Sequence, residues 1–142
     1  MSPWRLHKLV YYSQAWALVW DDKPLFRARI EAWMGGPAVP ALYKRHRGKF
    51  SIDKWSGEPS RLAPRQEIID AVITPYGKLT DWQLEQIVRT ERPWLEARKG
   101  LRTSERGHRE IMLESMQTYY EAVAADENAL LVADIDWPSN EI

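Results

Sequence analysis

Residues 2–20 constrain the fold more strongly than any other segment of this chain. The segment starts with Ser2 and Pro3, a typical N-cap residue followed by a proline in the first helical turn, and a helix breaker follows at 21–24. Between these signals apolar residues recur at near-helical spacing, and tyrosines and alanines widen the apolar surface beyond one stripe. A helix that is apolar on several sides is stable when other elements cover those sides. The sequence therefore predicts a central helix around which other elements pack.

The other segments predict a mainly α-helical, single compact domain of five to six helices. Further helices are expected over 40–48, 64–76, 80–88 and 108–125, with a short helical turn at 93–94. The third of these starts with a capping box, in which Thr80 and Gln83 satisfy each other's backbone amides. Ile73 and Ile111 are expected on buried helix faces.

In two segments the pattern of residues does not predict a regular helix. Residues 25–34 alternate apolar with polar or charged residues, which predicts a short strand or hairpin, although the end of this segment also fits a helical turn. Gly35, Gly36 and Pro37 predict a break in the chain, and the glycine-containing, charged segment 99–107 predicts a loop.

The composition of the chain indicates the cellular compartment in which we expect the protein. A chain of 142 residues fits one domain. It contains no cysteine, which excludes disulfides and suits a reducing cytosol. The first residues lack the apolar core of a signal peptide, and no apolar run of about 18 residues is present. We therefore expect a cytoplasmic protein that does not enter a membrane.

Signatures of catalysis and cofactor binding are missing from the sequence. His7, His46 and His108 lie far apart and lack the spacing of a zinc site. The sequence contains no phosphate-binding loop, dinucleotide fingerprint or nucleophile elbow, and nothing points to a Ser/His/Asp site assembled by the fold. We predict a protein that is not an enzyme and needs no metal or cofactor.

The formal net charge is zero, but the charges are unevenly distributed along the chain. Residues 27–61 and 89–109 are rich in Lys and Arg, whereas residues 110–142 contain acidic residues and no Lys or Arg. Either the acidic end folds against the basic segments, or the basic segments bind an acidic partner. Basic residues 44–49 lie beside aromatic residues, as in a nucleic-acid site, but a pI near 6.8 argues against non-specific affinity for nucleic acid.

A series of motifs runs in order along the chain. They are Arg5-Leu-His-Lys-Leu-Val-Tyr-Tyr-Ser-Gln-Ala-Trp16, Lys23-Pro-Leu-Phe26, Ile30-Glu-Ala-Trp33, Gly36-Pro-Ala-Val-Pro-Ala-Leu-Tyr43, Tyr76-Gly77 and Glu91-Arg-Pro-Trp94. In this order they resemble the Panacea domain of SocA-like antitoxins. The resemblance implies that residues 1–125 form this domain and that 126–142 are an acidic C-terminal tail.

The residues that carry the resemblance are expected to set the fold. They are Lys8, Tyr11, Gln14, Trp16, Glu31, Trp33, Gly36, Pro37, Pro93 and Trp94. Two arrangements remain open for Lys8 and Glu31, a buried ion pair or two exposed charges.

The resemblance also implies a function. Members of the family neutralise a cognate protein toxin by direct contact, without catalysis, and the toxin is expected to be encoded by an adjacent gene, often on a prophage. One branch acts as an adaptor that delivers its toxin to a cellular protease. The alternative is a phage or mobile-element regulator that binds DNA or a host factor through the basic patch.

Contacts with a toxin are expected where members of the family differ. The candidates are aromatic, apolar and arginine residues, which make strong interface anchors. They are Tyr43, Arg45, Arg47, Phe50 and Trp55, followed in the tail by Leu131, Ile135 and Trp137.

Overall fold

The computed structural model describes residues 2–46 and 66–126. This part of the chain forms six helices and one small antiparallel sheet, so the predicted mainly helical fold is confirmed. The helices are α1 (Pro3–Asp21), α2 (Pro40–His46), α4 (Gln66–Tyr76), α5 (Asp81–Thr90), α6 (Arg92–Ala97) and α7 (Leu113–Ala125). The strands are β1 (Ile30–Trp33), β2 (Gly36–Ala38) and β3 (Glu110–Ile111). Within the described residues, none of the helices combines the length and hydrophobicity that a membrane span requires.

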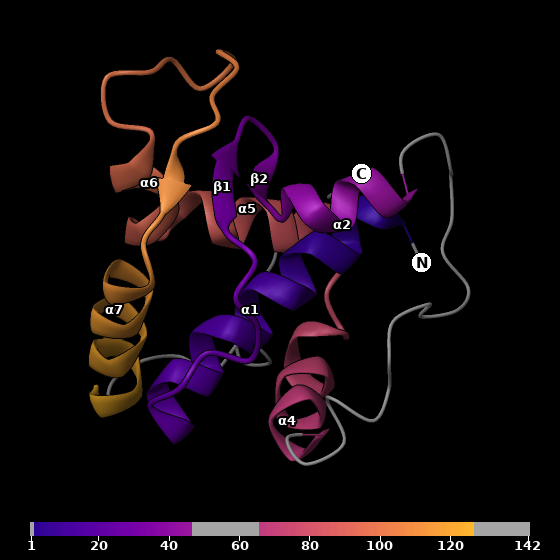
Figure 1. The fold of residues 1–142 in the computed structure, drawn as a ribbon, viewed down its shortest axis with the longest axis vertical. Helices are drawn as coiled ribbons and strands as arrows, with labels where there is room; N and C mark the ends of the chain where they lie inside the picture. The colour runs from indigo at the N-terminus through magenta and orange to yellow at the C-terminus, as the bar shows by residue number, and fades with distance from the viewer. Residues whose placement is uncertain (1, 47–65, 127–142) are drawn as a thin grey trace.

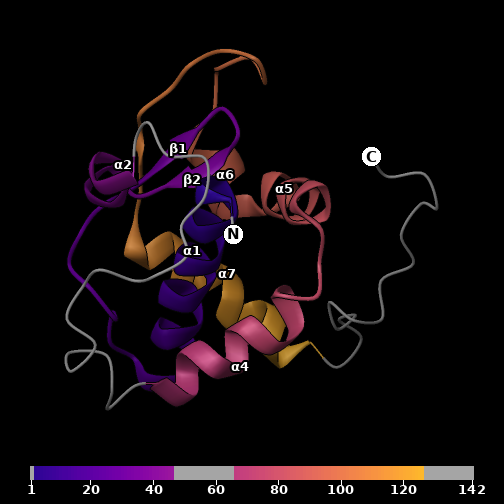
Figure 2. The same cartoon turned by 90° about the vertical axis from the view of Figure 1, so that its right-hand side faces the viewer.

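Helix α1 is the centre of the molecule, as its composition predicts. Ser2 Oγ caps the helix by accepting a hydrogen bond from the Arg5 amide at 3.0 Å. Helices α4, α5 and α7 and strand β2 all pack against α1 (Figures 1 and 2). Tyr11, Tyr12 and Ala15 are fully buried as a result.

The sheet has the order β2-β1-β3, and both pairings are antiparallel. The strand predicted within 25–34 is therefore confirmed, and it forms a hairpin with β2. The predicted break at Gly35–Pro37 is only partly right, because the turn precedes Gly36, which already belongs to β2. Gly36 has φ 136°, and a Cβ atom there would lie 3.3 Å from Lys8 Cε, so this position favours glycine.

Two expectations from helical periodicity are wrong. Residues 110–111 form β3, and Ile111 is buried opposite Ile30 in the sheet, so the last helix begins at Leu113 instead of His108. The spacing of apolar residues does not reveal this pairing, because the partner strand lies far away in the sequence. Ile73 is exposed, whereas its neighbours Val72 and Tyr76 form the buried face of α4.

The joint between α5 and α6 brings Glu91 to the core. The capping box of α5 is confirmed, with Thr80 and Gln83 exchanging hydrogen bonds of 2.8 and 3.1 Å. Glu91 follows α5 in extended conformation and is the N-cap of α6, and Pro93 occupies the first turn of α6. This change of direction points Glu91 toward α1 and α7, where it meets two tyrosine hydroxyls.

Candidate partner-binding surface

Four aromatic side chains from four different segments meet at the sheet end of the molecule. Trp4 comes from the first turn of α1, Trp33 from the end of β1, Tyr43 from α2, and His108 from the segment before β3. The Trp4 and Tyr43 rings stack with centroids 6.0 Å apart, and Trp33 lies edge-on to Tyr43 at 5.2 Å. The His108 ring lies edge-on to Trp33 at 5.7 Å. We call these four residues the aromatic surface.

The aromatic surface is accessible to a partner. Trp4 is 47% exposed, and the His108 side chain is 72% exposed. Trp33 and Tyr43 are half-buried between them. Large rings that are both exposed and held in place lose little conformational entropy when they bind, which is why tryptophan and tyrosine are common interface anchors.

Glu31 fixes the position of Trp33. Its Oε1 atom accepts a hydrogen bond of 2.8 Å from Trp33 Nε1, and its Oε2 atom pairs with Arg29 at 2.8 Å. His108 Nδ1 lies 3.7 Å from the same carboxylate. Glu31 is itself buried, so the carboxylate forms a rigid support beneath one side of the aromatic surface.

Lys8 is also buried, but it does not pair with Glu31. Its Nζ atom donates to the Trp4 carbonyl at 3.4 Å, and no ion pair of Lys8 is found in the described part of the chain. Burial lowers the pKa of Lys8, and the negative charges of Glu85 and Asp81 act in the opposite direction. Neither expected arrangement of Lys8 and Glu31 is therefore correct, because the two side chains are buried at separate sites.

His7 supports the aromatic surface from below. Its ring is fully buried and stacks under Trp4 with centroids 5.3 Å apart. Nδ1 of His7 accepts a 2.9 Å hydrogen bond from the Val39 amide, which links α1 to the residue that precedes α2. This bond fixes the orientation of the His7 ring, against which the Trp4 ring stacks.

A network of tyrosines surrounds Glu91 at the joint between α5 and α6. Tyr12 and Tyr120 both donate to Glu91 Oε1, at 2.6 and 2.8 Å, and the Tyr11 hydroxyl lies 3.1 Å from that of Tyr120. Burial raises the pKa of Glu91 to about 7, although the two hydrogen bonds favour the ionised form. Trp16 joins the network through a 3.2 Å hydrogen bond to Tyr76.

Other residues that carry the family resemblance bond to the backbone. Gln14 accepts from the Leu25 amide at 2.7 Å and donates to the Phe26 carbonyl at 2.9 Å. Trp94 Nε1 donates to the Trp33 carbonyl at 2.9 Å. These bonds hold the segment after α1 and the β1–β2 hairpin in place. Among residues 2–46 and 66–126, no group of three or more metal-ligating side chains is placed to hold an ion.

The structure locates only some of the contact residues predicted from the sequence. Tyr43 belongs to the aromatic surface, and Arg45 is exposed on α2 close by in the sequence. The other candidates lie outside the described residues. They are Arg47, Phe50, Trp55, Leu131, Ile135 and Trp137.

Sequence reasoning missed Trp4 and His108, and it gave Trp33 only a role in the fold. The abundance of tryptophan was a general signal for recognition, since the chain contains eight. No local pattern shows that these rings meet, because the β1–β2 hairpin and the start of α1 bring them together.

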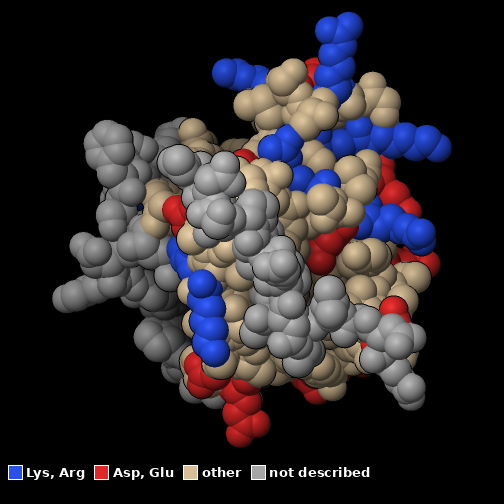
Figure 3. Space-filling view, turned by 180° about the vertical axis from the view of Figure 1, so that it is seen from behind, with Lys and Arg blue, Asp and Glu red and all other residues tan. Residues whose placement is uncertain are grey.

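The second basic segment forms a projecting loop between α6 and β3. Lys99, Arg102, Arg106 and Arg109 are exposed on it, and none of them forms an ion pair within the described residues. Figure 3 shows Lys and Arg side chains projecting from the upper end of the molecule, where Figure 1 places this loop. This part of the basic sequence is not neutralised by the described acidic residues.

These features define a mainly helical domain that presents a supported aromatic surface beside a basic loop. A family model described as "Antitoxin SocA-like, Panacea domain" matches residues 6–95, more than half of the 142-residue chain. The chain belongs to this family, as its motifs predict. Comparisons with curated proteins and with solved structures give no match.

Proposed function

We propose that this protein is an antitoxin that neutralises a cognate protein toxin by direct, non-catalytic binding. The observation that carries the proposal is the aromatic surface, found in a chain of the SocA-like antitoxin family. Trp33 and Tyr43 lie within the family-matched segment, whereas Trp4 and His108 flank it. The surface thus combines residues inside the family-matched segment with residues outside it.

The aromatic surface has the physical properties that tight binding requires. Sequestering a toxin at nanomolar affinity needs about 12 kcal/mol of binding free energy. A standard interface of roughly 1,600 Å² provides this when a few anchors are well buried. Trp33 is held by Glu31 and Trp4 rests on His7, so these anchors are largely ordered before the partner arrives.

We further propose that the interface continues beyond the four rings. Helix α2 carries Tyr43 and Arg45 and leads directly to Arg47, Phe50 and Trp55 in the sequence. The tail contributes the remaining candidates, which are Leu131, Ile135 and Trp137. The toxin would be encoded by an adjacent gene, as on a prophage, and would be bound in the cytoplasm. Delivery of the bound toxin to a cellular protease is the second mechanism that family membership supports.

Co-expression with the product of each adjacent gene tests the proposal. We expect one neighbour to arrest growth alone, and this chain to restore growth and co-purify with it. Trp4→Ala should weaken binding by about 2 kcal/mol, roughly 30-fold, because it removes a central anchor. Trp20→Ala is the matched control, since Trp20 is 51% exposed and lies on the last turn of the same helix.

Other outcomes are equally informative. Rescue without a stable complex would favour delivery for degradation over sequestration. Loss of binding in Trp20→Ala but not in Trp4→Ala would move the interface to the other end of α1. If no neighbour is toxic, the antitoxin proposal is wrong for this chain.

A further inference from the structure

Residues 98–109, the basic loop, carry positive charge that the fold does not neutralise. Four of its side chains are exposed cations, and none of them forms an ion pair within the described residues. They are Lys99, Arg102, Arg106 and Arg109. Glu105 is the acidic residue among them, and its Oε1 atom accepts a 3.3 Å hydrogen bond from the Arg102 backbone amide. The cations of the loop are therefore accessible to an acidic partner.

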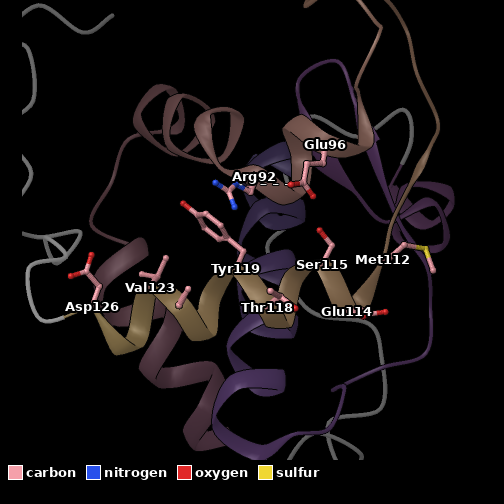
Figure 4. A pocket seen from close by; sticks show the side chains of 10 residues that line it. Arg92, Glu96, Met112, Glu114, Ser115, Thr118, Tyr119, Val123 and Asp126 are labelled. Atoms are coloured by element: carbon pink, nitrogen blue, oxygen red, sulfur yellow. Dashed lines mark ion pairs between the residues drawn. The ribbon is translucent and has the colours of Figure 1, made fainter.

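The neighbouring arginines of α5 and α6 differ from those of the loop, because each lies near a carboxylate of its own helix. Arg89 lies 4.0 Å from Glu85. Arg92 lines a groove of about 620 Å³ between α6 and α7, where its Nε atom lies 4.0 Å from Glu96 (Figure 4). In this part of the chain, exposed cations without a carboxylate partner among the described residues therefore begin after α6.

The basic loop is ordered by Arg98 at its base. The buried guanidinium donates to the carbonyls of Ala32, Arg102 and Glu105. Gly107 packs against the same side chain, since a Cβ atom there would lie 3.0 Å from Arg98 Nη1. Two loop carbonyls thus point inward to Arg98, and the exposed cations project from an ordered framework. Ordering before binding lowers the entropy that the loop loses when a partner arrives.

The basic loop is continuous with the aromatic surface. His108 belongs to both, and the Arg109 carbonyl accepts a 2.7 Å hydrogen bond from β1, at the residue before Trp33. At the other end of the loop, Arg98 lies over the Trp94 ring, whose Nε1 atom donates to the Trp33 carbonyl. Figures 1 and 2 place the loop and the sheet at the same end of the molecule. A partner that covers the aromatic surface therefore lies beside the basic loop.

We infer that the basic loop binds an acidic patch on the toxin that docks on the aromatic surface. This inference rests on the proposed function and specifies the chemistry of the partner. Charges at the margin of an interface attract an oppositely charged surface before contact and raise the association rate constant. Buried aromatic anchors act mainly on the dissociation rate constant. The two parts of the interface should therefore be separable by kinetics.

The charge pattern favours a protein over nucleic acid. Exposed Glu105 lies within the loop, and exposed Glu110 follows it at the start of β3. Both would repel a continuous phosphate backbone, whereas the carboxylates of a protein surface can be spaced to avoid them. The formal net charge of zero also gives the chain no general attraction to nucleic acid.

The chain's own acidic residues 127–142 are the other possible occupant. Helix α7 starts near β3, at the loop end of the molecule, and its 13 residues carry the chain about 20 Å along the helix axis. Residues 127–142 therefore begin at the far end of α7 from the loop. A toxin that is already anchored on the aromatic surface reaches the loop without that span.

Charge reversal tests the inference through association kinetics. The full chain is measured by biolayer interferometry against the purified product of the adjacent gene that arrests growth, at low and at physiological salt. We expect Arg102→Glu with Arg106→Glu to lower the association rate constant about tenfold at low salt and about threefold at physiological salt, with little change in dissociation. Trp4→Ala should instead raise the dissociation rate constant.

A matched pair of reversals separates the loop from net charge. The Arg102 and Arg106 side chains form no hydrogen bond or ion pair within the described residues, so their replacement should leave the loop folded, which circular dichroism and limited proteolysis check. Arg27→Glu with Lys78→Glu makes the same change in charge at two exposed cations outside the loop. Equal slowing by both pairs would overturn the inference.

Two failures are distinguishable. If the toxin binds and reversal in the loop does not slow association, the inference is wrong while the proposed function stands. If no neighbour is toxic, the proposed function is wrong and the inference falls with it.

Two further measurements address the other occupants. A fluorescein-labelled DNA duplex of about 20 base pairs should not bind at physiological salt. Binding of this duplex that Arg102→Glu with Arg106→Glu abolishes would make the loop a nucleic-acid site and overturn the inference. A chain that ends at Asp126 should associate with the toxin within about twofold of the rate of the full chain. Much faster association would show that residues 127–142 cover the loop, which would also overturn the inference.

Discussion

Glu91 shows how one half-buried side chain links α1, the α5–α6 joint and α7. Both tyrosine donors reach the same oxygen, Oε1, and no hydrogen bond to Oε2 is found among the described residues. A carboxylate that is largely removed from water is costly to ionise. This explains why burial outweighs two hydrogen bonds and raises the pKa of Glu91 to about 7.

The raised pKa predicts how stability depends on pH. The folded chain holds this proton more tightly than the unfolded chain, whose carboxyl has an ordinary pKa near 4.5. The stabilising contribution is therefore fully present below about pH 4.5 and is lost as pH rises through about 7. Between pH 5 and pH 8 the free energy of unfolding should fall by about 2 to 3 kcal/mol from this group.

Glu91→Gln isolates the effect, because its amide does not titrate. We expect the variant to lack this loss of stability, so that the difference in unfolding free energy between it and the parent changes by about 2 to 3 kcal/mol from pH 5 to pH 8. Urea unfolding at several pH values measures the difference, and groups common to both chains cancel. Parallel stability curves would show that Glu91 is already ionised at pH 5.

At the scale of elements, Arg98 organises the loop between α6 and β3. The side chain is 4% exposed, lies over the Trp94 ring and donates to the Ala32 and Arg102 carbonyls at 3.1 and 3.0 Å. It also donates to the Glu105 carbonyl. One guanidinium thus ties the basic loop to itself and to β1, which arginine can do because its donors are fixed in one plane.

Removing this side chain should loosen the loop. Arg98→Ala leaves three carbonyls without their donor and should cost about 3 kcal/mol of stability. The loop contains trypsin sites at Lys99, Arg102 and Arg106, so limited proteolysis there should become at least about tenfold faster. Arg92→Ala is the control, because Arg92 is exposed and makes only a 4.0 Å ion pair. Equal cleavage rates in both variants would mean that other contacts hold the loop.

The elements that sequence could predict are those defined by local chemistry. The Ser2–Pro3 start of α1 and the Thr80–Gln83 box of α5 depend on residues within one turn, and both are found as predicted. Strand β3 exists because Ile111 pairs with Ile30, and no local pattern encodes that pairing. The contact between Tyr12 and Glu91 escaped prediction for the same reason.

The candidate site was less predictable than the fold. Tyr43 could be proposed because it adjoins a basic and aromatic segment, whereas Trp4 was hidden within a helix whose aromatic residues mostly serve the core. Exposure depends on which sides of α1 the other helices cover. Such coverage is a property of the whole molecule, so a single segment could not reveal it.

The whole molecule also depends on a helix that lies outside the family-matched residues 6–95. Helix α7 contributes the fully buried side chains of Met116 and Tyr120 to the core. Its Gln117 donates to the Leu18 carbonyl at 3.0 Å, at the C-terminal end of α1. Losing two large buried side chains removes about 5 to 10 kcal/mol, which is comparable to the total stability of a typical domain.

Two truncations therefore test where the folding unit ends. A chain that ends at Met112 lacks α7 and should lose its cooperative unfolding transition, because α1 would expose Tyr11 and Tyr12 on the side that α7 covers. A chain that ends at Asp126 keeps every described helix, and we expect its unfolding free energy to stay within about 1 kcal/mol of the full chain. Thermal unfolding followed by circular dichroism measures both. Cooperative unfolding of the shorter chain would place the boundary near the end of the family match, and a large loss in the longer one would make residues 127–142 part of the domain.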